Sequence, residues 1–384
     1  MTTFADVVIV GAGIVGCSTA FHLAQRKGTR VIVIEKGPIA YGMTKRSGAL
    51  IRAHFADAPT ARLALASLRA FQNWHDLVGE PGGWMPTGLV TTAGDDAGAA
   101  RLRREVERLR GIGVNTRMIS RDELRELQPA ARVDDIALAA YEPEAGYADP
   151  VEATQALATR AKALGATFKT GTYVKSILVD HGRVHGVDTT IGPIEALTVA
   201  VIAGPWSDRL LEPLGVGIGI QSLRAEVAFF ERPAELKAGH AAFIDTITGA
   251  HFRPHPYGLT MAGLTAPSPE PLKTPDQFDE SISREHVADV QRRVAARLPA
   301  MAQARFTRGH AGIYDMSPDG QPVLGNAPGI RGLVIAAGFS GNGFTLAPAV
   351  GACISELIAD GEARTADLGA FGLERFGKNA KRKT

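Results

Sequence analysis

Three glycines near the start of the chain have the spacing of a phosphate-binding turn. Gly11, Gly13 and Gly16 fit the pattern G-x-G-x-x-G, and Glu35 follows at the end of the next apolar run. The first glycine permits a tight turn, the second lets a pyrophosphate approach the backbone, and the third lets a helix pack closely on a strand. Glu35 can accept hydrogen bonds from ribose hydroxyls and would repel a 2′-phosphate. The pattern predicts a site for NAD or FAD, whose expected contacts are Gly11, Gly13, Ile14, Val15, Gly16, Glu35 and Lys36.

The segments around these glycines have the form needed to hold them. Residues 7–10 and 31–34 are continuous apolar runs, which is typical of parallel strands covered on both faces. Between them we expect a helix from Ile14 to Lys27, with Gly28 as its C-terminal cap. The N-terminus of that helix would offer free N–H groups to the phosphates. Strand, turn, helix and strand together favour a dinucleotide site over a bare turn with a surface acid.

A second glycine-rich segment lies near the other end of the chain. An apolar run at 333–337 leads into residues 338–344, and a closing helix is expected to reach about Gly361. Glycines let backbone N–H groups approach a ligand, and the helix that follows adds the positive end of its dipole. A first motif so early in the chain, in a sheet completed by this late segment, favours FAD bound in an extended form over NAD.

With the segment 319–325, Asp-Gly-Gln-Pro-Val-Leu-Gly, these motifs resemble the D-amino-acid-oxidase-like superfamily of FAD-dependent oxidoreductases. The chain is similar in particular to glycine and sarcosine oxidases and to the β subunits of sarcosine- and opine-type oxidases. The resemblance implies that Val174 meets the adenine and that the loop with Thr44 and Ser47 covers the diphosphate and the ring. The flavin contacts that it implies are Ala203, Gly204, Trp206, Gly338, Phe339, Ser340, Gly341, Asn342, Gly343 and Phe344.

Four residues are expected at the substrate end of the site. The resemblance aligns Arg52 with an arginine that holds the substrate carboxylate in sarcosine oxidases, and a guanidinium can meet a carboxylate with two hydrogen bonds. A structural ion pair is the alternative role for Arg52. His251 and Arg253 lie in a segment that matches the family's substrate-facing strand, and Tyr314 matches a tyrosine that caps the pocket or packs there. No general base is assigned, because hydride transfer needs a neutral amine, alignment and exclusion of water.

Four positions depart from what the resemblance implies for sarcosine oxidases. The lysine that activates oxygen aligns with Thr260, and a second carboxylate-binding lysine aligns with Thr345. The cysteine that tethers FAD in monomeric members falls near Gly312, and the FMN-binding histidine of some β subunits aligns with Ala148. We therefore expect non-covalent FAD, with O2 or another molecule as the electron acceptor.

The fold class expected is α/β, with an α+β two-domain organisation. It combines a Rossmann-type FAD-binding domain with a substrate domain that contains a mixed or antiparallel sheet. The predicted segments are residues 1–80, 147–215 and 310–372 for the FAD-binding domain, 81–146 and 216–309 for the substrate domain, and 373–384 for a flexible tail. Further helices are expected over 60–78, around 102–109, after a capping box formed by Ser120 and Glu123, from the N-cap Asp149 to Gly165 and over 283–298.

Composition excludes several other classes of protein. The chain has 384 residues, 45% of them hydrophobic and 21% charged, which is ordinary for a globular protein with room for two domains. The net charge of +2 comes from basic residues that are spread along the chain, so no nucleic-acid partner is expected. Cys17 and Cys353 are too few for a disulfide framework or a metal site. Without a signal peptide or an uninterrupted apolar stretch, we expect no membrane span and a cytoplasmic location.

These observations predict an FAD-dependent amine or amino-acid oxidoreductase. A hydride would pass from the Cα or N-methyl carbon of a small amino acid or secondary amine to flavin N5, giving an imine that hydrolyses. The first alternative is a flavoprotein β-type subunit of a hetero-oligomeric amine or opine oxidase or dehydrogenase, inactive or only partly active alone. Homo- and hetero-oligomers both stay open. An NAD enzyme or a flavoprotein disulfide reductase is the second alternative, and the lack of a paired cysteine motif and of a second G-x-G-x-x-G counts against it.

Overall fold

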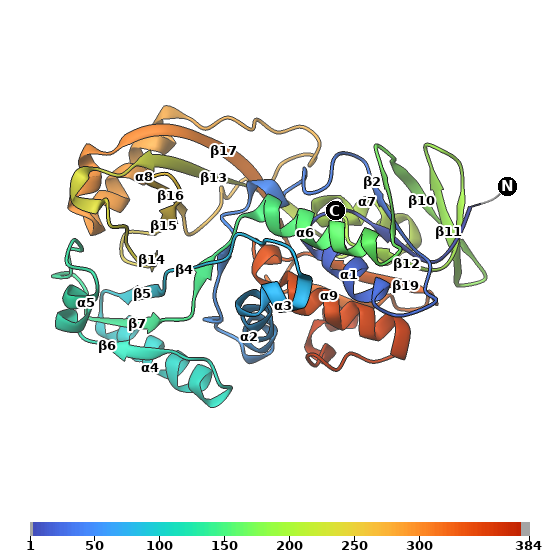
Figure 1. Cartoon of the computed structure of the whole chain (residues 1–384), viewed down its shortest axis with the longest axis horizontal. Helices are drawn as coiled ribbons and strands as arrows, with labels where there is room; N and C mark the ends of the chain where they lie inside the picture. Colours follow the sequence, from blue (N-terminus) through green and yellow to red (C-terminus); the bar gives the residue numbers. More distant parts are fainter. Residues whose placement is uncertain (1–2, 378–384) are drawn as a thin grey trace.

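The computed structural model describes residues 3–377, which form two regions side by side (Figure 1). One region, on the right in Figure 1, contains β1 (Thr3–Val10), β2 (Val31–Glu35), α1 (Ile14–Ala24) and α9 (Gly343–Asp360), so it holds both ends of the described chain. The other region, on the left, contains the strands of residues 221–264 and 305–316 and the helix of residues 284–297, and the strands of residues 89–142 lie below them. The fold is of the mixed α/β type, as the sequence predicts.

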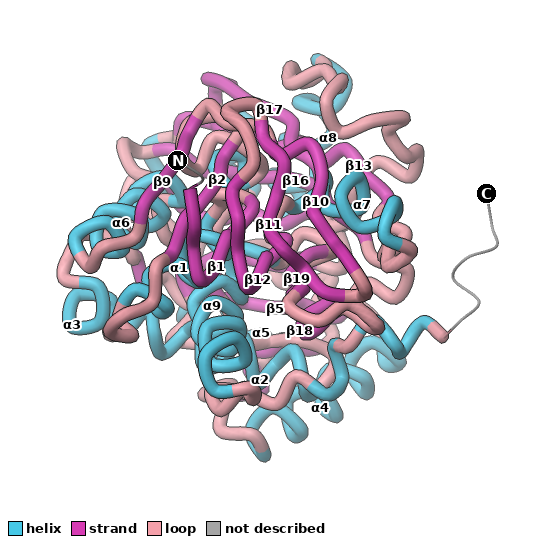
Figure 2. The backbone as a smooth tube through the Cα atoms, turned by 90° about the vertical axis from the view of Figure 1, so that its right-hand side faces the viewer, coloured by secondary structure: helices cyan, strands magenta, loops and turns pink. Residues whose placement is uncertain are grey.

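The first region is built on an eight-stranded sheet whose centre is parallel (Figure 2). β1 (Thr3–Val10) lies between β2 (Val31–Glu35) and β12 (Ile194–Val201), and it runs parallel to both. β19 (Leu333–Ala337) pairs in parallel with the end of β12, so strands far apart in sequence complete one sheet. The other strands are β9 (Thr167–Thr170), β10 (Val174–Asp180), β11 (Arg183–Thr189) and β18 (Val323–Asn326).

Both faces of this sheet are covered, which explains the continuous apolar runs in its strands. Val7 and Ile9 of β1 belong to the core that includes α1 (Ile14–Ala24), α6 (Pro150–Ala163) and α9 (Gly343–Asp360). Val8 and Val10 point to the opposite face, into a core with β10, β11 and α7 (Ser207–Leu211). Successive residues of a strand face opposite sides of the sheet, so a continuous apolar run places side chains in the core on each face.

The helix α9 runs through the core of this region, between α1 and α2 (Ala58–Gln72). Within residues 3–377 it is the one helix with the length and mean hydropathy, 1.2, of a membrane span, and 61% of it is buried inside the fold. A helix that is apolar all round is buried in a core or in a membrane. Its packing against α1 and α2 accounts for its composition.

The second region is a mixed sheet covered by α8 (Arg284–Arg297). Its strand order is β17-β13-β16-β15-β14-β5-β7-β6, and β14 pairs in parallel with β5 while the other pairs are antiparallel. Arg297 of α8 is fully buried and forms ion pairs of 2.8 Å with Asp245 and Asp135, which fixes the helix to the sheet. The strands are β5 (Leu89–Ala93), β6 (Arg117–Ile119), β7 (Leu138–Glu142), β13 (Gln221–Glu231), β14 (Ala242–Asp245), β15 (Ala250–His255), β16 (Leu259–Leu264) and β17 (Arg305–Met316).

Short elements join the two regions. β8 (Gly146–Tyr147) pairs with both β3 (Leu50–Ile51) and β4 (Met85–Pro86) in a small three-stranded sheet. The remaining α-helices are α3 (Trp74–Val78), α4 (Asp96–Gly111) and α5 (Arg121–Leu127). The nucleotide-binding sheet thus takes its strands from 3–35, 167–201 and 323–337, while the exact domain boundaries stay a prediction.

Most of the expected helices are confirmed, with one break. Ser120 and Glu123 form the predicted capping box of α5, and Asp149 caps α6. The prediction of one helix over 60–78 was wrong, because the chain leaves the helical conformation at Asn73, between α2 and α3. The Asn73 side-chain amide donates to the carbonyl of Arg69 at 2.8 Å, a local bond that competes with helix continuation.

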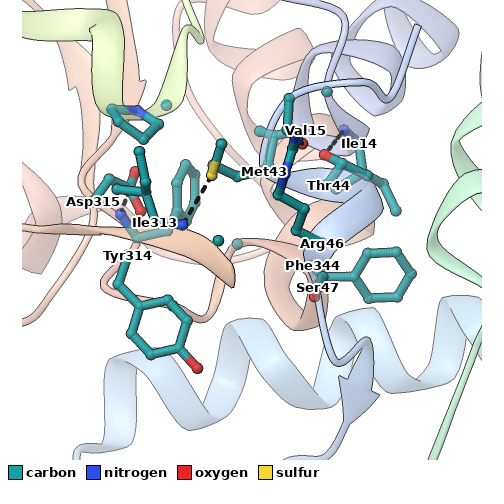
Figure 3. A pocket seen from close by; sticks show the side chains of 18 of the residues that line it. Ile14, Val15, Met43, Thr44, Arg46, Ser47, Ile313, Tyr314, Asp315 and Phe344 are labelled. Atoms are coloured by element: carbon teal, nitrogen blue, oxygen red, sulfur yellow. Dashed lines mark hydrogen bonds between the residues drawn. The ribbon is translucent and has the colours of Figure 1, made fainter. Parts of the chain in front are cut away.

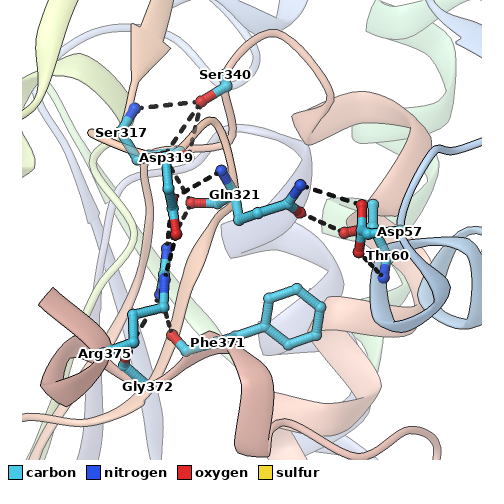
Figure 4. Close-up of polar contacts among 10 residues, drawn as sticks. Asp57, Thr60, Ser317, Asp319, Gln321, Ser340, Phe371, Gly372 and Arg375 are labelled. Atoms are coloured by element: carbon cyan, nitrogen blue, oxygen red, sulfur yellow. Dashed lines mark hydrogen bonds and ion pairs between the residues drawn. The ribbon is translucent and has the colours of Figure 1, made fainter.

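The C-terminal segment is anchored to the nucleotide-binding region (Figure 4). Arg375 donates to both carboxylate oxygens of Asp319, at 2.7 and 3.0 Å, and Gln321 contacts Asp57 at the start of α2. Residues 373–377, expected to open a flexible tail, therefore differ from that prediction and form a short 3-10 turn. The rest of the expected tail, 378–384, lies outside the described residues.

Candidate functional site

A cavity of about 660 Å³ lies at the junction of the two regions (Figure 3). The turn between β1 and α1 lines it, and so does the turn between β19 and α9. Every residue expected to contact the cofactor or substrate lines this cavity except Gly338. The structure thus brings together segments that are more than 300 positions apart in the chain.

The first turn has the backbone form that its glycines predict. Gly11 has φ +111°, and a Cβ there would lie 2.3 Å from the carbonyl oxygen of Ile202. A Cβ on Gly16 would lie 2.0 Å from the carbonyl oxygen of Gly11. The N-terminus of α1 has no side-chain cap and no acid in its first turn, although the Ile14 N–H bonds Thr44 Oγ1 at 3.1 Å (Figure 3). Helix N-termini of this kind suit a pyrophosphate.

Glu35 is fixed at the rim of the cavity by the backbone. One carboxylate oxygen accepts the N–H of Ala12 and the other that of Gly37, both at 2.8 Å. Each oxygen keeps a lone pair that could accept a ribose hydroxyl. Lys36 instead lies over the Trp206 ring at 3.5 Å and pairs with Asp276 at 3.3 Å.

The second glycine-rich turn is held by a buried acid of β17. The Asp315 carboxylate accepts the N–H groups of Gly338 and Phe339, each at 3.1 Å, and its carbonyl accepts that of Ser340. Burial raises the pKa of Asp315 to about 6, against the effect of these bonds. Gly338 therefore shapes the turn from behind the cavity wall. Neither a side-chain cap nor an acid occupies the first turn of α9, so its N-terminus is open to the cavity.

Arg52 and Tyr314 mark the expected substrate end. The Arg52 guanidinium lies 4.0 Å from the Phe55 ring centroid and donates to the His54 carbonyl. Burial lowers the pKa of Arg52 to about 10, so it stays charged at neutral pH, and burial raises the pKa of Tyr314. Tyr314 and Asp315 are neighbours on β17 whose side chains extend to opposite sides (Figure 3). The cavity therefore contains a guanidinium suited to a carboxylate.

His251 is a neutral hydrogen-bond acceptor in the cavity wall. Its Nδ1 lies 3.1 Å from the carbonyl oxygen of Leu264, so Nδ1 donates and Nε2 keeps its lone pair. Burial lowers the pKa of His251 to about 4, and the nearby Arg253 and Arg52 act in the same direction. Nε2 can therefore accept a hydrogen bond at neutral pH without adding charge.

Arg253 is largely occupied by the protein itself. Its Nε donates to the Gly48 carbonyl at 2.6 Å, its Nη1 donates to the Pro254 carbonyl at 2.9 Å, and it lies 4.0 Å from the Tyr147 ring centroid. These contacts favour a role in holding the loop around Gly48 over direct binding of a substrate.

The four residues that depart from the sarcosine-oxidase pattern lie in different parts of the structure. Thr260 is fully buried against His240, 2.8 Å away, and does not line the cavity. Thr345 and Gly312 do line it, and the Thr345 hydroxyl donates to the Leu50 carbonyl at 2.6 Å. The Ala148 N–H bonds the carbonyl of Ala49. In the part of the chain that the structure describes, no cluster of three His, Cys, Asp or Glu could hold a metal.

Several cavity residues carry no recognisable signal in the sequence. Residues 265–281, called here the strap, cross from the second region and line the cavity through Thr265, Pro275, Asp276, Phe278 and Glu280. Asp276 accepts from Trp206 Nε1 and from Arg209, each at 2.6 Å. The proline content of this segment indicates only a surface loop, so its contact with the nucleotide-binding region depends on tertiary structure.

Met43 was also missed, although its sulfur accepts the Ile313 N–H at 3.0 Å (Figure 3).

These residues fit FAD. Two uncapped helix N-termini open onto one long cavity, which suits a cofactor with a pyrophosphate at one end and a ring that gains negative charge at the other. Arg52, expected at the substrate end, lines the same cavity.

Comparison with known proteins agrees with this site. The family model described as "FAD dependent oxidoreductase", DAO, matches residues 6–357. Glycine oxidase of Geobacillus kaustophilus is 29% identical over 98% of both chains, and sarcosine oxidase subunit beta of an Arthrobacter species is 29% identical over 97% of this chain and 91% of that one. The crystal structure of L-proline dehydrogenase from P. horikoshii superimposes with a TM-score of 0.90 at 28% identity, covering 98% of both chains. The chain belongs to the DAO family of FAD-dependent oxidoreductases and is an amine or amino-acid oxidoreductase that uses FAD.

Proposed function

We propose that this enzyme oxidises a small amino acid or secondary amine whose carboxylate is bound by Arg52. The observation that carries the proposal is a partly buried, charged guanidinium in the same cavity as the two cofactor turns. A buried charge needs an opposite charge or hydrogen bonds to offset its desolvation, and a substrate carboxylate would supply both.

The chemistry divides between cofactor and protein. Non-covalently bound FAD would supply the acceptor, at N5, for the hydride that leaves the Cα or N-methyl carbon beside the nitrogen. The nitrogen lone pair forms the C=N bond, and water then hydrolyses the imine. Arg52 would orient the carboxylate, while Nε2 of His251 would accept an N–H of the amine. Tyr314 would cover the pocket and help to exclude water.

The remaining expected cofactor contacts follow from the same cavity. Thr44 and Ser47 would cover the diphosphate, and Val174 would meet the adenine. We infer that the expected contacts from residue 11 to residue 344 form one continuous FAD site, because all except Gly338 line one cavity. O2 or another electron acceptor would reoxidise the flavin. The cytoplasmic location stays a prediction.

A second candidate is a subunit role in a hetero-oligomer. The similarity to a protein named sarcosine oxidase subunit beta extends over nearly the whole of this chain. Such a subunit would bind FAD yet turn over slowly alone. Steady-state turnover by the purified chain with an artificial acceptor separates the candidates: full activity favours the complete enzyme, and flavin reduction without sustained turnover favours the subunit.

The direct test is anaerobic reduction of the FAD-loaded protein by glycine, sarcosine, L-proline and D-alanine. At least one of these should bleach the oxidised flavin. Pyrrolidine, which is proline without its carboxylate, should reduce the flavin much more slowly than L-proline does. Arg52→Gln removes one charge-assisted interaction, so it should raise the concentration needed for half-reduction by about 10- to 100-fold while FAD stays bound. Unchanged reduction of the Arg52→Gln protein would contradict the proposed role.

A further inference from the structure

A buried carboxylate lies behind Arg52, outside the set of residues that motifs identify. Glu142 is the last residue of β7, in the second region, and is 2% exposed. Arg52 follows β3, on the side of the nucleotide-binding turns. The two residues come from segments that the small β3–β8–β4 sheet brings together, since β8 begins shortly after β7.

The Glu142 carboxylate is bonded to the backbone directly after Arg52. One oxygen accepts the N–H of Ala53 at 2.7 Å, and the other accepts the N–H of His54 at 3.1 Å. The first of these N–H groups belongs to the peptide unit that carries the Arg52 carbonyl, so one carboxylate fixes two successive peptide planes. The direction in which the Arg52 side chain leaves the backbone is therefore set from the far side of the domain junction.

We infer that Glu142 is a positioning residue, which aims the Arg52 guanidinium at the substrate carboxylate by holding the backbone of Ala53 and His54. The inference rests on the proposed function and extends it to a residue that need not touch the substrate. A guanidinium fork binds a carboxylate well only in a narrow range of orientations, so a loose backbone costs affinity.

The charges around Glu142 agree with this role. Burial raises the pKa of Glu142 to about 7, while the two backbone bonds and Arg52 oppose the rise. Glu144 adds a like charge nearby. On the Arg52 side, His54 contacts Glu105 at 3.4 Å, and burial raises the pKa of Tyr314. Burying a carboxyl group costs free energy, and its hydrogen bonds to two backbone N–H groups offset part of that cost.

The test measures binding of unreactive carboxylates, acetate and benzoate, through their perturbation of the flavin absorption spectrum. Glu142→Gln keeps one acceptor oxygen but turns an NH2 group toward the other N–H, so carboxylate affinity should fall by about tenfold. Glu144→Gln is the matched control, because the Glu144 carboxylate bonds Gln72 and Asn115 and not the Arg52 backbone. It should bind both carboxylates as the natural protein does. FAD affinity should be equal in all three proteins.

A double-mutant cycle separates positioning from general loosening of the fold. If Glu142 acts through Arg52, adding Glu142→Gln to Arg52→Gln should lower carboxylate affinity by less than about twofold further. A full additive loss in that background would overturn the inference, and so would normal acetate and benzoate binding by Glu142→Gln. If neither carboxylate perturbs the spectrum of the natural protein, Arg52 does not bind carboxylates. In that case the proposed function fails first, and the inference falls with it.

Discussion

At the scale of single residues, several buried or partly buried acids of this protein bond to backbone N–H groups. Glu35 holds the first cofactor turn, Asp315 the second, and Glu142 the segment after Arg52. Asp208 accepts from three successive N–H groups at residues 218–220. A carboxylate has several lone pairs, so one side chain can fix a loop that has no regular secondary structure.

Replacing Asp315 tests this use of a buried acid. Asp315→Ala removes the carboxylate oxygen that accepts both N–H groups of the turn, so weaker FAD binding and a loss of stability of about 1–3 kcal/mol are expected. Titration with FAD and urea unfolding would measure the two effects. Asp319→Asn, on the surface near the same turn, should leave FAD affinity close to normal.

The raised pKa of Asp315 predicts how the stability of the protein depends on pH. The pKa of Asp315 is raised from 3.8 to about 6 in the folded protein, so protonation favours folding. Its contribution is present in full below about pH 4 and is lost as pH rises through about 6, a change of up to about 3 kcal/mol. The natural protein should therefore lose more stability between pH 4.5 and 7 than Asp315→Asn does. Parallel pH curves for the two proteins would show that the carboxyl does not titrate in this range.

Sequence patterns predicted the residues whose contacts are close in sequence. They did not predict residues whose contacts lie far away in the chain. Gly11, Gly13 and Gly16 act on the backbone next to them, so their spacing predicts the turn. Glu142 bonds residues 89 positions away, and nothing in its neighbourhood indicates that contact. Arg52, Tyr314 and His251, expected from position-by-position matching to the family, all line the cavity, because the family shares the fold that places these positions there.

At the scale of elements, the strap is the part of the site that was predicted least well from the sequence. The sequence indicated a surface loop over residues 267–275, and the strap that contains this loop also reaches the nucleotide-binding region through Asp276. Helix ends were easier: Ser120 and Asp149 cap their helices as predicted, because a cap needs only the residues beside it. The break at Asn73 was missed, since apolar periodicity continues across it.

Cutting the strap's attachment should speed release of FAD. Asp276→Ala removes bonds to Lys36, Trp206 and Arg209, all partly exposed, so the effect should be modest, about three- to tenfold in the dissociation rate. Recovery of free-flavin fluorescence after dilution would measure it. Asp279→Ala, whose carboxylate bonds Ser281 within the strap, should release FAD at the normal rate. Equal rates in both variants would show that the strap does not retain the cofactor.

At the scale of the whole molecule, the fold depends on close contact between its two ends. α1 and α9 pack where Gly351 faces Ser18, and a Cβ on Gly351 would lie 2.1 Å from Ser18 Oγ. Both helices also point their N-termini into the cavity. Two-domain architecture could be predicted from the motifs, whereas the pairing of β19 with β12 follows from the folded sheet.

Gly351→Ala should therefore disturb structure and cofactor together. Overpacking at this crossing is expected to cost about 1–3 kcal/mol and to weaken FAD binding, because separating the helices moves both N-termini. Thermal unfolding with and without added FAD would measure both. Ala359→Ser lies at an exposed position of the same helix and should change stability by less than about 0.5 kcal/mol. An intact FAD affinity in Gly351→Ala would mean that the helix ends do not bind the cofactor jointly.

The order of strands in the nucleotide-binding sheet also has a consequence for synthesis in the cell. A ribosome that has released β1, β2 and β12 has not yet made β19 or α9, so the nascent chain has an apolar sheet edge and half a cofactor pocket. Flavin capture must wait until translation is nearly finished. Newly made apoprotein should thus be most vulnerable to proteases and aggregation during that interval, and a supply of FAD can protect only chains whose synthesis has passed α9.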